Sequence, residues 1–205
     1  MNQPKKLASI VFIAAVIVFG GRVSFSQNDS KAAAEPNYEA MLYVILGSDD
    51  TTQRGELPKG LTAVSRQLHD NFSYQNYKLV NTYIGRVANT GSLEYKSVSN
   101  IFGAEQTGDV PSFLEWTVSG VRSGQAAGGA ESVQIQAFRF GARVPIKLTY
   151  IRDESGKQSS SINYESVGLT VNRTGIAGNT PTLIGNIALP KTTGTVFLVL
   201  TVRPV

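Results

Sequence analysis

The chain has 205 residues, of which 41% are hydrophobic and 17% charged, and its formal net charge is +4 at pH 7. It has no cysteine, which excludes disulfides, thiol catalysis, cysteine-ligated metals and an acylated-cysteine anchor. Its basic residues form no run or stripe of the kind that marks nucleic-acid binding, so nucleic acid is not expected among its partners.

The first 26 residues have the pattern of a signal peptide. Two lysines precede the uncharged segment 7–21, and the small residues Ser24 and Ser26 fit the positions that signal peptidase reads. The uncharged segment has 15 residues, fewer than the ~20 that a membrane-spanning helix needs. We therefore predict a signal peptide over 1–26. The alternative is that 7–21 stays uncleaved and anchors the protein.

Removal of this segment would leave an almost neutral exported protein. Three of the 19 basic residues lie within 1–26, which leaves 16 basic against 15 acidic residues. Exported eukaryotic domains commonly rely on disulfides, so a chain without cysteine suits a bacterial envelope better. The predicted location is the periplasm or cell envelope, with membrane contact only through 7–21 if that segment is uncleaved. Residues 27–37 are polar and aperiodic and are predicted to be a flexible leader.

The first structured element is predicted at 38–46, where a dense apolar run indicates a buried strand. Loop 47–60 follows. Its acidic residues Asp49, Asp50 and Glu56 offer oxygen ligands that calcium accepts, but their spacing matches no EF-hand loop. A solvated turn is the expected reading, and no metal site is predicted.

One amphipathic helix follows the loop. Leu61, Val64, Leu68 and Phe72 lie on a single stripe of a 3.6-residue period, with polar residues on the opposite face. A stripe on one side of a helix packs on a sheet.

From residue 76 onward the pattern predicts strands, separated by Gly, Pro and Asn. The predicted strands are 76–87, 92–102, 112–121, 133–151, 161–172, 182–189 and 194–202. The Gly/Ala-rich stretch 123–132 lacks side chains that could hold a core, so it is predicted to be a loop or a domain boundary. We expect an α+β domain at 38–122 and a β-rich domain at 133–205.

The predicted fold class is thus α+β, predominantly antiparallel β with one main amphipathic helix, and with a β-sandwich-like or sheet carboxy-terminal part. Apolar positions change parity within 133–151 and within 161–172, so each strand either bulges there or is apolar on both faces. The last strand, 196–202, is apolar at nearly every position, which predicts a central strand.

Residues 143–171 predict a β-hairpin around a long polar turn, and this hairpin resembles a segment of the bacterial secretins, ring-forming outer-membrane channels. A strand with Val-Pro is followed there by a polar loop and a strand that matches INYESVGLTV at 162–171. The downstream stretch NRTGIAGNTP at 172–181 departs from the secretin pattern. The resemblance implies an envelope protein that assembles with copies of itself or within a larger complex. The interaction residues that it implies are Val144, Pro145, Ile146, Tyr164, Val167, Gly168 and Leu169.

Little in the sequence indicates catalysis. His69 is the sole histidine, and Asp70 beside it on the helix cannot face it. No G-x-S-x-G turn presents a nucleophile and no glycine-rich phosphate loop occurs. No cofactor is predicted.

Two acidic residues next to aromatic ones superficially suggest a glycosidase pair. Glu115 precedes Trp116, and Glu94 precedes Tyr95. Strand alternation explains both carboxylates as outward positions, and their separation is not given by the sequence.

The prediction is a non-enzymatic bacterial envelope protein that acts by contact with a protein partner or with itself, in an assembly related to secretins. The alternative is a soluble domain that binds a sugar or a peptide on an exposed sheet face through Tyr or Trp. A hydrolase is the third choice.

Overall fold

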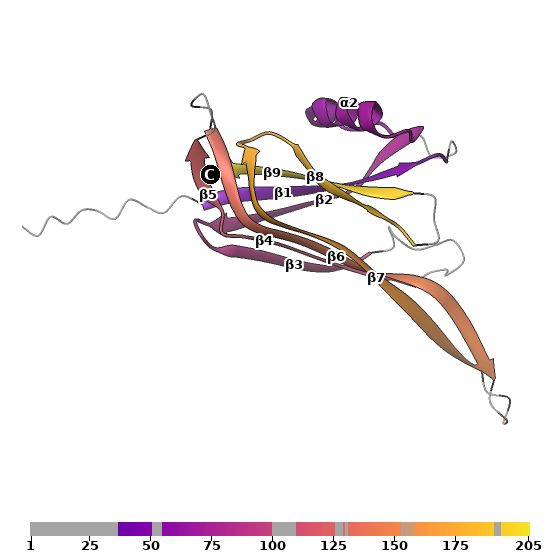
Figure 1. Ribbon diagram of the computed structural model, residues 1–205. Coiled ribbons are helices and arrows are strands. Elements are labelled where there is room, and N and C mark those ends of the chain that lie inside the picture. The colour runs from indigo at the N-terminus through magenta and orange to yellow at the C-terminus, as the bar shows by residue number, and fades with distance from the viewer. Residues whose placement is uncertain are drawn as a thin grey trace, which may run out of the picture. The chain divides into compact units, whose positions relative to one another are not determined.

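A computed structural model describes residues 37–50, 55–99, 110–125, 129, 131–152, 154, 156, 158–190 and 194–205. The predicted signal peptide and the leader up to residue 36 lie outside these residues. Residues 35–205 form one compact unit, which Figure 1 shows with its elements labelled.

The described residues contain nine strands, one α-helix and a short 3₁₀ helix. In chain order they are β1 (Asn37–Ser48), η1 (Lys59–Leu61), α2 (Thr62–Asn71), β2 (Asn76–Ala88), β3 (Ser92–Ser99), β4 (Ser112–Ser119), β5 (Arg122–Gln125), β6 (Glu131–Arg152), β7 (Gln158–Ala177), β8 (Thr182–Ala188) and β9 (Thr195–Pro204). Neither described helix has the length and hydrophobicity needed to cross a bilayer.

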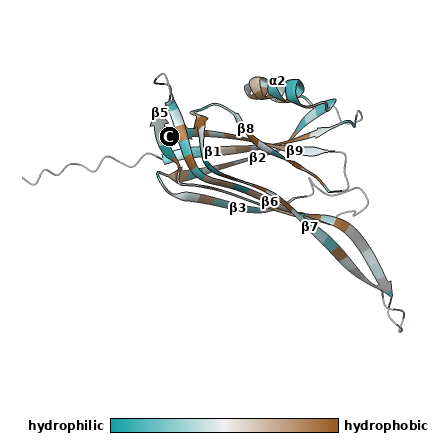
Figure 2. Ribbon diagram, in the orientation of Figure 1, coloured by the Kyte–Doolittle hydropathy of each residue, from teal (hydrophilic) through white to brown (hydrophobic). Residues whose placement is uncertain are grey.

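The strands form two antiparallel sheets. The four-stranded sheet has the order β2-β1-β9-β8, and the five-stranded sheet has the order β3-β4-β6-β5 with β7 paired to β6. Buried positions alternate with exposed or partly exposed ones along β4, and Figure 2 shows hydrophobic and hydrophilic residues interspersed along β6 and β7. The predicted fold class, mostly antiparallel β with one helix and a sandwich-like arrangement, is confirmed.

The main core lies between the two sheets and is built from the inward positions of their strands. In the four-stranded sheet, Tyr38 and Leu42 of β1 are buried, and in the five-stranded sheet Trp116 of β4 and Phe138 of β6 are buried. Burying each such side chain stabilises the fold by about 1.5–3 kcal/mol. Strands from both sheets contribute to one continuous cluster, so the sandwich depends on both.

Helix α2 covers the other face of the four-stranded sheet. Leu61, Val64 and Leu68 pack with Ile45 of β1 and Phe197 of β9 in a second buried cluster. The predicted stripe is therefore confirmed. Strand β9, hydrogen-bonded to β1 and β8 and covered on both faces, is the central strand that its apolar sequence predicted.

Strands from the two sides of 123–132 pair with each other, so of the two predicted roles for this stretch the structure favours a loop. β1 from the first predicted domain pairs along its length with β9 from the second, and β4 pairs with β6 in the same way. Ser123 itself lies in β5, and its Oγ is hydrogen-bonded to the Tyr38 hydroxyl at 2.8 Å across the two sheets. β5 and β6, which include the two ends of this stretch, pair with each other in the five-stranded sheet.

The two parity changes fall in different backbone settings. In β6 the change falls between Ile135 and Phe138. The pairing with β7 keeps its register there. On β7, opposite this point, the backbone of Arg173 has a positive φ of 53°. In β7 the pairing continues without a shift past Tyr164 and Val167. These two side chains therefore lie on opposite faces of one regular strand. The register shift of this hairpin lies in β6, between Pro145 and Lys147.

Replacing Phe197 by alanine should cost about 3–5 kcal/mol of unfolding free energy, because the ring is fully buried and lies 4.7 Å from the Phe72 ring, centroid to centroid. Urea denaturation followed by circular dichroism would measure this cost. Ile84→Ala is the control, since Ile84 is 59% exposed on β2 and its loss should change stability by about 0.5 kcal/mol or less. Equal effects of the two substitutions would contradict this view of the core.

Candidate interaction site

The predicted hairpin is formed by β6 and β7, and its outer half extends past the neighbouring strand. β6 and β7 pair from Ser132↔Ala177 to Arg152↔Gln158, whereas the pairing of β4 with β6 ends at Phe113↔Arg143. Beyond that point, 144–152 and 158–165 continue as a two-stranded unit, called the ribbon below, which extends past the ends of the other strands (Figure 1). The nine residues 144–152 correspond to about 30 Å of extended chain.

A ribbon of two strands has little support of its own. An isolated hairpin is marginally stable in water, and a third strand or a packed face is normally needed. Along 147–152, the edge of β6 that faces away from β7 has no strand partner among the residues that the structure describes. Such an edge is available for pairing with another chain.

Three of the predicted interaction residues belong to the core of the sandwich. Val144 is buried, and the partly buried Val167 and Leu169 pack against the same cluster. Their role is to fix the base of the hairpin on the four-stranded sheet, and they offer little surface to a partner.

Pro145, Ile146 and Tyr164 lie where the ribbon leaves the sandwich. Pro145 is buried and faces Tyr164, and the register shift follows at the partly buried Ile146. The Tyr164 hydroxyl donates a hydrogen bond to the carbonyl oxygen of Pro111, at 3.2 Å. This bond ties the base of the ribbon to the residue that precedes β4.

Gly168 lies where two backbones approach closely. A Cβ atom at this position would lie 2.7 Å from the carbonyl oxygen of Phe140 on β6. Because that contact is with backbone, it cannot be relieved by a side-chain rotation.

The exposed apolar side chains of the ribbon were not among the predicted residues. Tyr150 is 61% exposed and Ile162 is 37% exposed. Tyr150 pairs with Ser160, two residues from Ile162, so the two apolar side chains lie on the same face and are diagonal neighbours. The period-2 pattern could have indicated that they share a face, but nothing local indicates that this face is uncovered.

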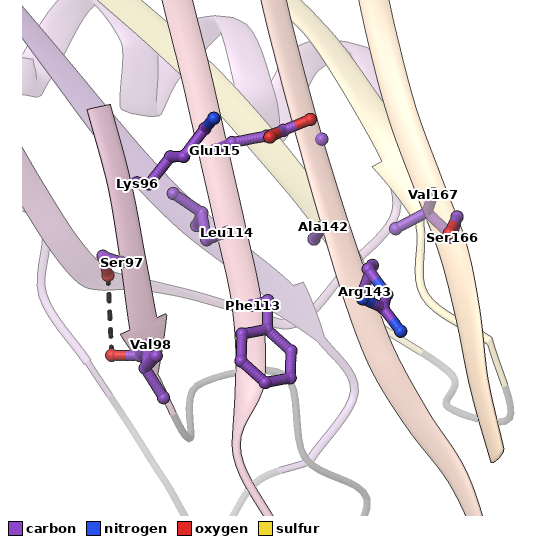
Figure 3. A pocket seen from close by; sticks show the side chains of 11 residues that line it. Lys96, Ser97, Val98, Phe113, Leu114, Glu115, Ala142, Arg143, Ser166 and Val167 are labelled. Atoms are coloured by element: carbon purple, nitrogen blue, oxygen red, sulfur yellow. Dashed lines mark hydrogen bonds between the residues drawn. The ribbon is translucent and has the colours of Figure 1, made fainter. Parts of the chain in front are cut away.

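A shallow hollow lies next to the ribbon base, on the outward face of the five-stranded sheet. It has a volume of about 410 Å³ and crosses β3, β4, β6 and β7. Figure 3 shows its two rows of outward side chains, one with Lys96 and Glu115 and the other with Val98, Phe113 and Arg143.

The charges of the first row are partly engaged. Lys96 Nζ lies 2.7 Å from a carboxylate oxygen of Glu94. This hydrogen bond raises the pKa of Lys96, and the negative charge of Glu94 adds to the effect. Lys96 therefore remains charged, and it faces Glu115 on the neighbouring strand.

The suggested glycosidase pair is not accompanied by an aromatic platform. Glu94 and Glu115 are exposed on the outward face, as alternation predicted. Trp116 is fully buried between the sheets, and Tyr95 on the same inward side contacts it with ring centroids 6.3 Å apart. The tryptophan on which a sugar-binding face could have depended is therefore turned to the interior.

The sole histidine has a structural environment. His69 Nδ1–H donates to the carbonyl oxygen of Ser65 at 2.8 Å, and its ring lies edge-on against Tyr77 with centroids 4.7 Å apart. These two contacts hold the ring against the preceding helix turn and Tyr77.

The acidic loop braces the start of β2. Asp49 Oδ1 accepts a hydrogen bond from the backbone N–H of Gln75, and the Asp50 carbonyl accepts one from Asn76 Nδ2. Residues 51–54 of this loop lie outside the described residues. Within the described part of the chain, no group of three or more acidic or histidine side chains is arranged to hold a metal ion.

Comparisons with known proteins give one weak similarity. No family model and no curated protein matches the chain. A match among solved structures is the single-particle cryo-EM structure of the V. cholerae type IV competence pilus secretin PilQ, with 8% sequence identity and a TM-score of 0.38. The match covers 100% of this chain and 66% of that chain, just under two thirds of its length. It is a weak resemblance to a secretin and establishes no common fold.

Gly168→Ala should destabilise the hairpin base by about 1–3 kcal/mol, because the added methyl group meets the Phe140 carbonyl oxygen. Thermal unfolding would measure the loss. Gly60→Ala is the matched control, since a Cβ there meets nothing within 4 Å and should leave stability unchanged or slightly raised. A Gly168→Ala protein as stable as the wild type would show that the two strands can separate without cost.

Proposed function

We propose that this chain is a non-enzymatic protein of the bacterial cell envelope that acts by protein–protein contact, with the ribbon as its contact element. The observation that carries the proposal is the pair Tyr150 and Ile162, exposed on one face of two strands that extend past the sandwich. Val144, Val167 and Leu169 of the same hairpin pack in or against the core, whereas Tyr150 and Ile162 do not.

Two physical properties of the ribbon favour a protein partner. Its apolar face loses contact with water when another surface covers it, at about 25 cal/mol per Å² of apolar area. Its open β6 edge at 147–152 can accept the backbone hydrogen bonds of a further strand. A partner that does both converts a marginal two-stranded unit into part of a larger sheet.

The partner that we propose is a second copy of the chain. A face and an edge on the same projecting ribbon can be presented by each copy to its neighbour, so identical chains can satisfy one another. The finer form of the proposal is an assembly related to secretins. It rests on the local resemblance of 143–171 and not on the weak structural match.

The proposed location rests on the amino-terminal sequence. The signal-peptide pattern of 1–26 and the absence of cysteine favour export to a bacterial periplasm or envelope. A self-associating protein in that compartment needs no disulfide if its contacts are made by strands and apolar faces.

The double substitution Tyr150→Ser and Ile162→Ser should weaken self-association about tenfold or more, because it removes both exposed apolar side chains of the ribbon. Light scattering on a sizing column, with the full chain at several concentrations, would give the mass of each protein. The wild type is expected at a multiple of the protomer mass and the variant at the protomer mass.

Ile84→Ser is the control, because this side chain is similarly exposed but lies on β2, outside the ribbon. It should leave the mass of the oligomer unchanged. A wild-type monomer at every concentration would contradict self-association. An oligomer that survives the double substitution would show that the ribbon is not the contact.

A further inference from the structure

The hollow on the five-stranded sheet combines a charged side, an apolar side and a backbone floor. Along its axis the inward-facing residues Leu114 and Ala142 are buried in the core, so the backbone forms its floor. Gly141 contributes no side chain to the first row, and this keeps the centre of the hollow open. Four adjacent strands cross it, about 14 Å from the first to the last at the usual strand spacing.

Arg143 is held in a fixed place at one end of this hollow. Its guanidinium carbon lies 5.6 Å from the centroid of the Phe113 ring and 5.2 Å from that of the Tyr164 ring. The two rings contact each other with centroids 5.6 Å apart, and the hydrogen bond of Tyr164 to Pro111 fixes the second ring. Two cation–π contacts therefore position the guanidinium before any ligand arrives.

A guanidinium that rests on aromatic faces keeps its N–H groups available at its edge. Those groups form a planar fork that matches a carboxylate with two parallel hydrogen bonds. Among the described residues, Arg143 makes no ion pair, whereas Lys96 in the opposite row is engaged by Glu94. Arg143 is therefore the cation of the hollow that a ligand can use.

The row of outward side chains that contains Arg143 also contains the apolar side chains Phe113 and Val98. Phe113 is 40% exposed and Val98 is 62% exposed, on the two strands next to β6. A ligand that bridges from the guanidinium to these side chains would have an anionic end and an apolar end.

We propose that the hollow binds an organic carboxylate attached to an apolar or aromatic group, with the carboxylate on Arg143 and the apolar group over Phe113 and Val98. The side chain of an acidic peptide next to an apolar residue and a free aromatic acid share this chemistry. The site lies on the sandwich and does not depend on association through the ribbon.

The probe for the first test is 3-phenylpropionate, titrated into the full chain and followed by two-dimensional ¹H–¹⁵N NMR. Saturable shifts are expected, including the Nε–H signal of Arg143. The neutral analogue 3-phenylpropionamide should bind about tenfold or more weakly, since it lacks the charge that makes the bidentate pair strong. A short acidic-aromatic peptide, Ac-Glu-Phe-NH₂, forms a second arm that distinguishes the peptide source from the free acid.

Arg143→Gln should weaken binding of 3-phenylpropionate about ten- to a hundredfold, and its unchanged NMR spectrum elsewhere would show that the exposed substitution leaves the fold intact. Arg139→Gln is the matched control, because Arg139 is exposed on the same face of β6, four residues before Arg143. It should bind as the wild type does.

Three results would overturn the proposal. The first is that neither 3-phenylpropionate nor Ac-Glu-Phe-NH₂ gives saturable shifts. The second is that the Arg143→Gln variant binds 3-phenylpropionate with the affinity of the wild type. The third is equal affinity for acetate or inorganic phosphate, which would mean that the apolar side takes no part. Tighter binding of the peptide than of the free acid would support a peptide ligand, and the reverse would support a small aromatic acid.

Discussion

The burial of β9 on both of its faces is the constraint on which the whole fold depends. All eight residues Thr195–Val202 are buried, with alternate side chains in the core between the sheets and in the core under α2. A strand of this kind is stable only where both faces are covered. The five-stranded sheet and the helix are therefore both required. Because β9 pairs with β1, the first and last strands of the described chain meet at the centre of one sheet, and folding must close a loop of nearly the whole unit.

Local patterns were enough to predict the helix and the approximate positions of the long strands, because each of these elements carries its own periodicity. The partners of the strands were not predictable in this way. The small residues of 123–132 separate two apolar regions along the sequence and so suggested two domains, although β1 and β9 on either side of them are hydrogen-bonded neighbours. Which strands pair is decided by the fit of whole faces that lie far apart in the chain, and no short window contains that information.

The candidate surfaces show the same limit at the level of single residues. Val144 and Leu169 were chosen because the hairpin resembles a secretin segment, yet they belong to the core. Tyr150 is exposed on the part of β6 that continues beyond the last pair with β4, Phe113↔Arg143, and the length of β4 is not encoded in β6. The hollow around Arg143 is likewise assembled from four strands, and its arginine, phenylalanine and tyrosine have ordinary positions when each strand is taken alone.

The register shift between Pro145 and Lys147 separates the geometry of the ribbon from that of the sandwich. On the sandwich side, the pairing of β6 with β4 and β7 is fixed by buried side chains. On the other side, every residue of 149–152 and 159–163 whose burial is described is exposed or partly exposed. Insertions or deletions of two residues in each strand would lengthen or shorten the ribbon by about 7 Å and return every side chain to its face. The reach of this protein is therefore free to diverge among related chains while its core stays the same.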